Sequence, residues 1–254
     1  MPSPPDIYES GRLLDEYLLF HYGSEADILP APGAGVTPAQ RAAMAEATDF
    51  PVRTVAHFTS TGGRALDLGC AVGRSTFELA RTCDEVIGID FSHNFIRAAQ
   101  TLRDGASIAY RRHEEGHLHT LLSARAPAGI DPQRVHFEQG DAMDLRPDLG
   151  TFDRVHAANL LCRLPEPLRL LQRLPGLVTP GGELVLATPC TWLEEFTPPG
   201  HWPSGNTFSW LLQLLEPTFH HRETTHEPFL IRETARKFQW SLSQVSVWQR
   251  RAAD

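Results

Sequence analysis

The fold is decided by one stretch of the chain, Ala65-Leu-Asp-Leu-Gly-Cys-Ala-Val-Gly73. A short apolar run that contains Asp67 is followed by two glycines, Gly69 and Gly73, ahead of a helix that we expect to start near Ser75. Glycines in these positions allow the backbone to turn sharply and to approach a ligand closely. The stretch therefore predicts a buried strand, a tight loop and a helix that together hold a nucleotide-like cofactor.

Outward from this stretch, short apolar runs alternate with helical patterns. Strands are expected at Arg64–Leu68, Glu85–Asp90, Val135–Gln139, Phe152–Ala157 and Glu183–Ala187. Helices are expected between them at Ser75–Arg81, Asn94–Arg103 and Pro167–Leu174, the last ending at Pro175-Gly176. Alternation of this kind predicts an α/β fold with a doubly wound parallel sheet.

The segments around this core carry their own patterns. Ahead of it we expect an amphipathic helix at Ile7–Tyr22, a helix that Thr37-Pro38 begins and that ends near Ala47, and a short helix around Phe50–Thr59. Alternating residues in the insert Gly105–Pro132 predict a hairpin arm. Two extended runs within Phe219–Arg251 predict an antiparallel pair at the sheet edge.

Length and composition favour one domain. The chain has 254 residues, of which 41% are hydrophobic, enough for a sizeable core. We expect a helical cap at 1–60, a cofactor-binding core at 61–190, and substrate-side additions with the sheet edge at 191–254. The net charge of −8 disfavours a nucleic-acid partner. The chain has neither a signal-peptide pattern nor a long apolar run, so we expect a cytoplasmic protein with no membrane partner.

Cysteine and histidine spacing gives no sign of a metal site. The four cysteines, Cys70, Cys83, Cys162 and Cys190, form no CxxC pair, so we expect reduced thiols. Two groups of histidines, His117 with His119 and His220 with His221 and His226, have no cysteine or carboxylate at a ligand spacing. We therefore expect surface histidines and no metal.

Two further acidic residues limit which class of cofactor the chain can bind. Asp90 ends the second strand about 20 residues after the glycine loop, where a carboxylate can accept hydrogen bonds from ribose hydroxyls. A nicotinamide dinucleotide would need the same acid. Ala71 stands where its fingerprint requires glycine, and Gly140-Asp141-Ala142 follows the third strand, so a cofactor without a diphosphate is favoured.

Four motifs in order resemble those of class I methyltransferases, which bind S-adenosylmethionine (SAM). They are Asp67–Gly73, Gly88-Ile-Asp-Phe-Ser92, Gly140-Asp-Ala142 and Val178-x-Pro-Gly-Gly-x-Leu-Val185. The resemblance implies a Rossmann-like, seven-stranded sheet of order 3-2-1-4-5-7-6 with the seventh strand antiparallel. It implies that SAM is bound, and S-adenosylhomocysteine (SAH) released, by Asp67, Gly69, Cys70, Ala71, Gly73, Asp90, Phe91, Ser92, Asp141, Ala142 and Asn159. Among these, Asn159 would lie near the reactive methyl group. Ala71 is unstrained if its φ is negative, whereas a positive φ would cost about 1 kcal/mol.

The additions to this core resemble the methyltransferase domain of ovothiol synthesis. The similar segments are Tyr8–Gly23, Ala157–Leu164, Thr188–Glu195, Pro228–Glu233 and Arg236–Gln239. The resemblance implies a thiohistidine acceptor methylated on an imidazole nitrogen, and a separate sulfoxide synthase as the partner that supplies it. An amino-acid acceptor calls for cationic and acidic side chains and for aromatic packing. The candidates are Tyr17, Tyr22, Asn159, Arg163, Trp192, Glu194, Glu195 and Arg232.

Several alternatives remain at this stage. In the first alternative, the chain methylates another small metabolite. In the second it is a dinucleotide-binding oxidoreductase, and in the third it is a binding module without catalysis. Arg232 has an alternative role as the ion-pair partner of a neighbouring glutamate. The tyrosines have an alternative role as core residues. No catalytic base is assigned, because a neutral imidazole already has a lone pair to offer.

Overall fold

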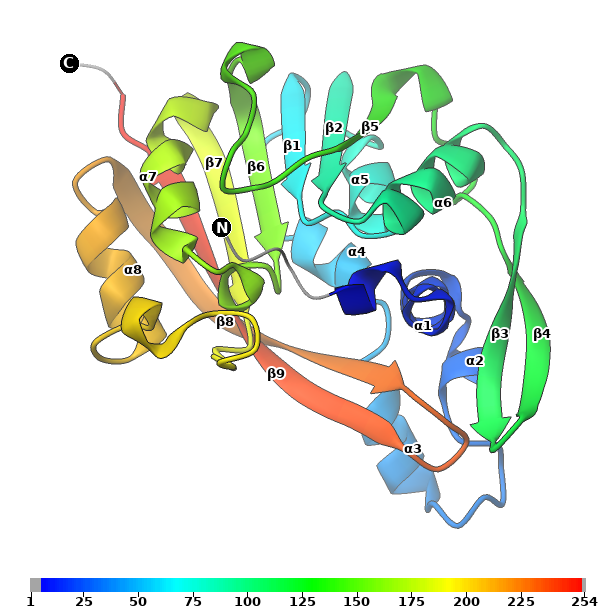
Figure 1. Ribbon diagram of the computed structural model, residues 1–254. Helices are drawn as coiled ribbons and strands as arrows, with labels where there is room; N and C mark the ends of the chain where they lie inside the picture. The colour runs from blue at the N-terminus through cyan, green and yellow to red at the C-terminus, as the bar shows by residue number, and fades with distance from the viewer. Residues whose placement is uncertain (1–5, 253–254) are drawn as a thin grey trace.

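The computed structural model describes residues 6–252, and its centre is one seven-stranded sheet (Figure 1). The strands are β1 (Arg64–Leu68), β2 (Glu85–Asp90), β5 (Val135–Gln139), β6 (Phe152–Ala158), β7 (Val178–Thr188), β8 (Phe219–Arg232) and β9 (Phe238–Arg250). They lie in the order β5-β2-β1-β6-β7-β9-β8. The first five are parallel, and β9 runs antiparallel to both of its neighbours. Counted without the hairpin strands β3 and β4, this is the order 3-2-1-4-5-7-6, so the predicted fold is confirmed.

One predicted strand is longer than expected. β7 begins at Val178 and not at Glu183, because the Pro180-Gly181-Gly182 stretch lies inside the strand as an irregularity. Its pairing with β6 shifts between Phe152 and Arg154, and Gly181 takes a φ of 81° there. A glycine absorbs this conformation without strain. The stretch therefore bends the strand and does not precede it.

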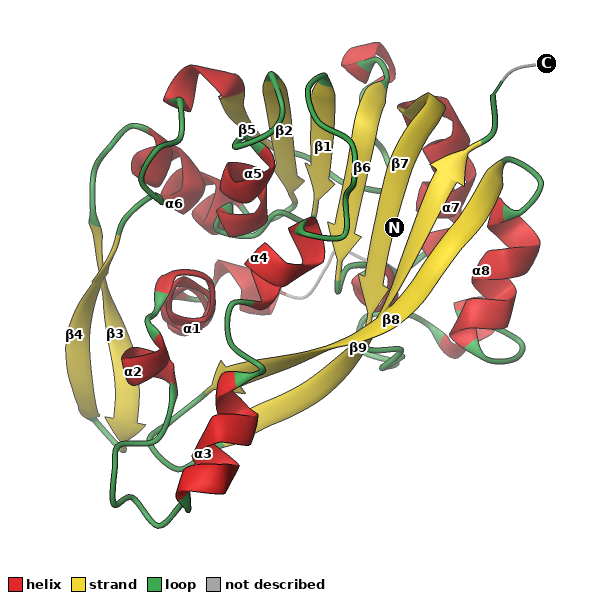
Figure 2. Cartoon of the chain, turned by 180° about the vertical axis from the view of Figure 1, so that it is seen from behind, coloured by secondary structure: helices red, strands yellow, loops and turns green. Residues whose placement is uncertain are grey.

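Helices cover both faces of the sheet. One face carries α4 (Phe50–Val55), α5 (Arg74–Leu79) and α6 (His93–Arg103), as Figure 2 shows from behind, and the other carries α7 (Pro167–Leu177) and α8 (Thr207–Leu215). Residues of α1 (Gly11–Tyr22) pack into the same core as α5 and α6. Alternate side chains of β1 point to opposite faces of the sheet. Ala65 packs in the core formed with α1, α5 and α6, whereas Leu66 and Leu68 pack in the core formed with α7 and α8.

The helices differ from the predictions in three places. The helix predicted at Ile7–Tyr22 is divided, because Ser10 accepts the Leu13 N–H and begins α1 at Gly11, after a separate turn at Asp6–Glu9. α7 continues through Pro175 to Leu177, because proline in the last turn keeps a helical φ and the Val178 N–H still reaches the Leu174 carbonyl. α8 was not predicted at all; its Asn206 side chain caps the Ser209 N–H. Shorter elements complete the chain: α2 (Glu25–Ile28), α3 (Pro38–Ala45), η1 (Asp6–Glu9), η2 (Pro132–Arg134), η3 (Pro147–Leu149), η4 (Leu161–Arg163) and η5 (Pro199–His201).

The predicted hairpin arm and the predicted tail pair are both present. The arm consists of β3 (Ile108–Glu115) and β4 (Leu118–Ala124), which pair antiparallel and lie against α1. The ends of β8 and β9 leave the main sheet as a ribbon that reaches toward α3 (Figures 1 and 2). α1 lies below the carboxyl ends of the parallel strands (Figure 1). In the part of the chain that is described, no helix is long and apolar enough to cross a membrane.

Candidate functional site

A cavity of about 370 Å³ lies at the carboxyl ends of the parallel strands, a size typical of small-molecule sites. Loops that follow β1, β2, β5, β6 and β7 border it from above, and residues of α1 and α4 border it from below. Its wall includes most of the predicted cofactor residues: Asp67, Gly69, Cys70, Ala71, Asp90, Phe91, Asp141, Ala142 and Asn159. Gly73 and Ser92 stand just behind that wall. The sheet topology thus brings three of the four sequence motifs, together with Asn159, to one site.

The loop after β1 makes a strained turn. Gly69 has a φ of 70° and Ala71 a φ of 48°, so Ala71 is in the left-handed region and its methyl group costs about 1 kcal/mol. The strained conformation aims the Ala71 N–H at Asp90, whose Oδ2 accepts it at 2.9 Å. Gly73 is required for another reason, since a Cβ there would lie 2.6 Å from Cζ of Phe137. The loop therefore combines a strained residue, Ala71, with a position, Gly73, that has no room for a side chain.

Asp90 is held ready to bind hydroxyl groups. Its Oδ1 accepts the Ser92 N–H at 2.9 Å, while Oδ2 accepts that of Ala71. Burial raises the pKa of Asp90 to about 6, although these two backbone bonds oppose the shift. The group is still mainly a carboxylate at pH 7.5. A carboxylate accepts about four hydrogen bonds, so two positions remain for the hydroxyls of a ribose.

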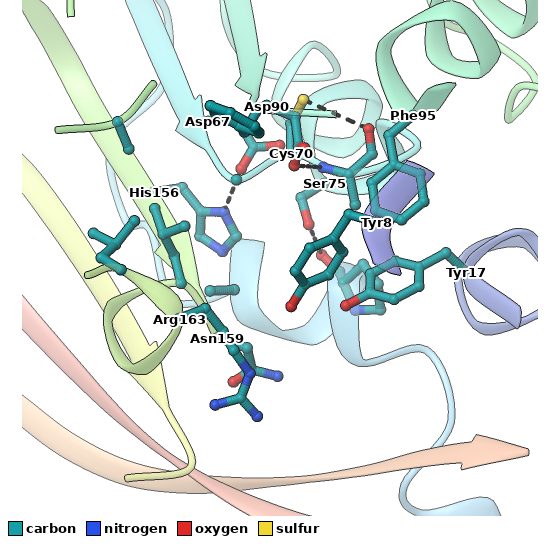
Figure 3. A pocket seen from close by; sticks show the side chains of 18 of the residues that line it. Tyr8, Tyr17, Asp67, Cys70, Ser75, Asp90, Phe95, His156, Asn159 and Arg163 are labelled. Atoms are coloured by element: carbon teal, nitrogen blue, oxygen red, sulfur yellow. Dashed lines mark hydrogen bonds and ion pairs between the residues drawn. The ribbon is translucent and has the colours of Figure 1, made fainter. Parts of the chain in front are cut away.

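Asp67 has internal partners. It is 1% exposed, and its oxygens accept the Thr76 hydroxyl at 2.6 Å and bond to Nδ1 of His156 at 2.8 Å. Nε2 of His156 lies 3.1 Å from Oγ1 of Thr54. Figure 3 shows the Asp67 and His156 pair at one side of the cavity. Asp67 thus ties the loop to β6 and α5, and any contact with a cofactor is additional to that role.

Aromatic side chains form the opposite wall. Tyr17 lies against Phe95 with ring centroids 4.7 Å apart, and Tyr8 meets the same ring edge-on at 6.1 Å. Phe20, Phe50 and Phe229 continue this wall. Burial raises the pKa of Tyr8 to about 12 and that of Tyr17 further, so both phenols keep their protons at neutral pH. They can donate hydrogen bonds but do not act as bases.

Arg163 is the cation on the cavity wall. Its Nη1 donates to the carbonyls of Cys162 and Thr191, each at 3.0 Å, and its guanidinium lies 4.8 Å from the ring centre of Phe196. Asn159 lies on the same side of the cavity (Figure 3), with a φ of 55° and its Oδ1 accepting the Ser243 hydroxyl at 2.5 Å. The two predicted residues thus lie together, and Tyr8 is near enough to Arg163 for the positive charge to oppose the rise that burial causes in the Tyr8 pKa.

Arg232 requires a correction. It was predicted to bind substrate, but it lies off the cavity wall and is 7% exposed. Its Nη2 donates to Oε2 of Glu114 at 2.7 Å, and its Nη1 to the carbonyls of Asp27, Ile28 and Leu29 at 3.2–3.3 Å. The side chain joins β8, the hairpin arm and the end of α2. Its role is structural because its donors are directed at protein groups.

Four other predicted substrate residues also lie off the cavity wall. The Tyr22 hydroxyl donates to the Val72 carbonyl at 2.7 Å, which ties α1 to the glycine loop. Trp192 donates to Oγ1 of Thr207 at 3.0 Å and packs toward α8. Glu194 and Glu195 are exposed on the following loop. Of the predicted acceptor residues, Tyr17, Asn159 and Arg163 border the cavity.

His21 and His156 also border the cavity, although neither was predicted from the sequence. His21 follows Tyr17 by four residues on α1, so helical spacing would have placed both on one face. His156 lies within an apolar strand pattern, where nothing local marks it. Among residues 6–252 there is no group of three or more histidine, cysteine, aspartate or glutamate residues that could hold a metal ion.

Comparison with known proteins identifies the family. A family described as "Methyltransferase domain" matches residues 40–234, well over half of the chain. A ubiquinone biosynthesis O-methyltransferase of Methylococcus capsulatus is 27% identical over 135 residues, 52% of this chain and 46% of that protein. A phosphatidylethanolamine N-methyltransferase of Cereibacter sphaeroides is 31% identical over 134 residues, 53% of this chain and 54% of that protein. The chain spans about half the length of these curated relatives.

Solved structures show the same fold. A SAM-dependent methyltransferase of Methanosarcina mazei superposes with a TM-score of 0.54 at 18% identity, covering 78% of this chain and 97% of that one. The N-methyltransferase NodS of Bradyrhizobium japonicum, solved with SAH, gives a TM-score of 0.53 at 14% identity, covering 94% and 97%. At these identities the likeness concerns the fold alone.

The residues present fit SAM. The cavity has room for a small molecule, Asp90 has free acceptor positions for ribose hydroxyls, and the glycine turn brings the backbone to the cavity wall. A sulfonium cofactor has no phosphate, and the loop needs no second glycine at Ala71 for it. Taken with the family match, these features show that the chain belongs to the methyltransferase domain family and is a SAM-dependent methyltransferase domain.

Proposed function

We propose that this domain transfers the methyl group of SAM to a ring nitrogen of thiohistidine (5-thiohistidine, also named 4-mercaptohistidine), the reaction of ovothiol synthesis. The observation that carries the proposal is the composition of the cavity beyond the cofactor loop. Aromatic rings of Tyr17 and Phe95 stand on one side and Arg163 with Asn159 on the other, with the ring of Tyr8 between them (Figure 3). Such a space suits a planar heteroaromatic ring that carries a carboxylate.

The chemistry asked of the protein is mainly alignment. SAM supplies an already activated methyl group, so the acceptor nitrogen must only meet it in line. The aromatic wall would hold the imidazole flat and exclude water. Arg163 would pair with the carboxylate of the amino acid, because its guanidinium is the cation that borders the cavity. A neutral imidazole has a lone pair at neutral pH, so no base is required.

A second candidate is methylation of another aromatic metabolite. The same wall would accept a phenolic ring, and some relatives bear the name O-methyltransferase. A phenol would need its proton removed. Asp67 is 1% exposed and bonded to Thr76 and His156, and the remaining positions of Asp90 are the ones that suit the ribose hydroxyls of SAM. Neither carboxylate is then available as the base, which favours an acceptor that needs none.

The proposal includes a partner and a location. A separate sulfoxide synthase would supply the sulfurated histidine to this domain. Cys70, Cys83, Cys162 and Cys190 are free thiols, which agrees with a reducing compartment such as the cytoplasm.

The test is turnover by the purified protein with SAM and three acceptors: thiohistidine, histidine and a catechol. We expect a product one methyl group heavier from thiohistidine, with the new group on nitrogen by NMR. Methylation of the catechol and not of thiohistidine would refute the proposal in favour of the second candidate. Absence of transfer to any acceptor, with SAH bound, would indicate a binding module.

The role of Arg163 is tested by a double comparison. Arg163→Met should raise the KM for thiohistidine about 10- to 150-fold, since hydrogen bonds to charged groups contribute about 1.5–3 kcal/mol. It should leave the KM for the decarboxylated analogue, thiohistamine, unchanged. Arg103→Met removes a surface arginine that pairs with Asp104 and is the matched control. Equal effects on both acceptors would show that Arg163 acts through the structure and not through the carboxylate.

A further inference from the structure

His21 on α1 is a buried polar side chain without a polar partner. It is 8% exposed and borders the cavity. Its Nδ1 is enclosed and has no hydrogen bond, and no group among residues 6–252 bonds to its Nε2 either. The large majority of buried side-chain polar atoms are hydrogen-bonded, so an unpaired ring beside a cavity calls for an explanation. Because Nδ1 is enclosed, a ligand in the cavity would bond to Nε2, the other nitrogen that the described residues leave without a partner.

The other histidine on this wall shows the contrast. His156 has both ring nitrogens engaged, Nδ1 with Asp67 at 2.8 Å and Nε2 with Thr54 at 3.1 Å. Its ring is therefore satisfied by the protein. His21 lies among Tyr17 and Phe20, at centroid distances of 5.8 and 5.4 Å, and neither ring offers its nitrogens a hydrogen bond. Of the two, His21 is the one left for a ligand.

The surroundings of His21 keep its ring neutral. Burial lowers its pKa to about 3. Of the charged groups near it, Asp67 opposes this shift and Arg74 adds to it, and Nη1 of Arg74 donates to the His21 carbonyl at 3.0 Å. A neutral imidazole has one N–H. An enclosed N–H without an acceptor is rarer than an enclosed lone pair, so the proton belongs on Nε2.

We propose that His21 is an acceptor-binding residue, whose Nε2–H donates a hydrogen bond to an unprotonated atom of the acceptor ring or of its substituent. This inference rests on the proposed function for the identity of the acceptor. Thiohistidine offers the thiolate sulfur as this atom, because the ring nitrogen that is not methylated carries the proton of the neutral imidazole. The bond would fix the ring in the plane of the aromatic wall, and it would favour an acceptor with a hydrogen-bond acceptor atom at that position.

Two variants of His21 test the proposal. His21→Phe keeps a planar ring and removes the donor, whereas His21→Gln keeps an amide donor near the place of Nε2. We expect His21→Phe to raise the KM for thiohistidine about tenfold, with the Kd of SAH unchanged within about twofold, and His21→Gln to restore most of the loss. A KM that His21→Phe leaves unchanged would overturn the proposal. An equal loss of SAH affinity would also overturn it, because His21 would then serve the cofactor.

The matched control is His113→Phe. His113 lies on β3, away from the cavity wall, and its Nε2 is likewise enclosed without a hydrogen bond. The KM for thiohistidine should be unchanged in this variant. A rise equal to that of His21→Phe would overturn the proposal, because loss of any enclosed histidine would then produce it.

A second measurement needs neither a variant nor turnover. Nitrogen NMR of histidine-labelled wild-type protein should show His21 neutral, with the proton on Nε2, at every pH from 5 to 8. A ring that is protonated, or that titrates near the ordinary histidine pKa, would overturn the proposal. Failure of the wild-type protein to methylate thiohistidine would refute the proposed function alone, because the state of the His21 ring is read without an acceptor.

Discussion

Replacement of Asp90 by asparagine should weaken the binding of SAH about 10- to 150-fold at pH 7.5. Asp90 is oriented by the Ala71 and Ser92 N–H groups, and its free acceptor positions face the cavity. Two ribose hydroxyls bonded to a carboxylate form charge-assisted hydrogen bonds that contribute about 1.5–3 kcal/mol, which gives this range. Isothermal titration calorimetry with SAH measures it directly.

The pH dependence makes the prediction sharper. Because burial raises the pKa of Asp90 to about 6, the free protein loses its carboxylate as the pH falls through 6. If the bound state requires the ionised form, affinity is complete at pH 7.5 and falls about tenfold by pH 5, where about one molecule in eleven is ionised. The asparagine variant does not titrate, so its affinity should be nearly flat over this range.

The matched control is Asp84→Asn, which changes an exposed carboxylate that accepts the Gly63 N–H outside the cavity. Its affinity for SAH should equal that of the wild type. An unchanged affinity in Asp90→Asn, or a pH dependence that survives in that variant, would refute the reasoning and remove Asp90 from the cofactor site.

Three further predictions concern stability and metal dependence. Ala71→Gly should raise the free energy of unfolding, measured by urea denaturation, by about 0.5–1 kcal/mol, because glycine adopts a positive φ without strain. Ala80→Gly is the control: Ala80 has a φ of −65°, so glycine there should lower the free energy of unfolding. Arg232→Met should lower it by about 1–3 kcal/mol, with the KM for the acceptor unchanged, because the carbonyls of Asp27, Ile28 and Leu29 and one oxygen of Glu114 lose a donor. Glu114 keeps its bonds to Arg112 and Thr120 in this variant, and a changed KM in a folded variant would contradict a structural role. Dialysis against EDTA should leave methyl transfer unchanged, since no cluster of metal ligands was found among the described residues; loss of activity that zinc or magnesium restores would contradict this.

The sheet could be predicted from the sequence because its signals are local. β1, β2 and β5 occupy the predicted ranges. β1 and β2 are buried and read as short apolar runs, whereas β5, at the edge of the sheet, shows the alternation of a strand with one exposed face. The resemblance to a known family then supplied the strand order. α8 was not predicted, although its segment after the last predicted core strand is rich in apolar residues. Its apolar side chains pack against α7 and Trp248, and this long-range packing holds the helix in position.

More of the predicted cofactor residues than of the predicted acceptor residues border the cavity. Gly69, Ala71 and Asp90 lie in motifs whose spacing fixes their geometry. Arg232 was placed wrongly because its partner, Glu114, is 118 residues away on the hairpin arm, and no local pattern records that pairing. Whether a side chain faces a cavity or a distant strand depends on how the additions fold over the core.

The most direct test of the central claim is a crystal structure of the protein with SAH and thiohistidine. We expect the ribose hydroxyls on Asp90 and the sulfur of SAH directed at the acceptor ring, which would lie between Tyr17 and Asn159 with a ring nitrogen nearest to that sulfur. A ribose bound away from Asp90, or an acceptor whose sulfur and not its nitrogen lies nearest to the sulfur of SAH, would contradict the account.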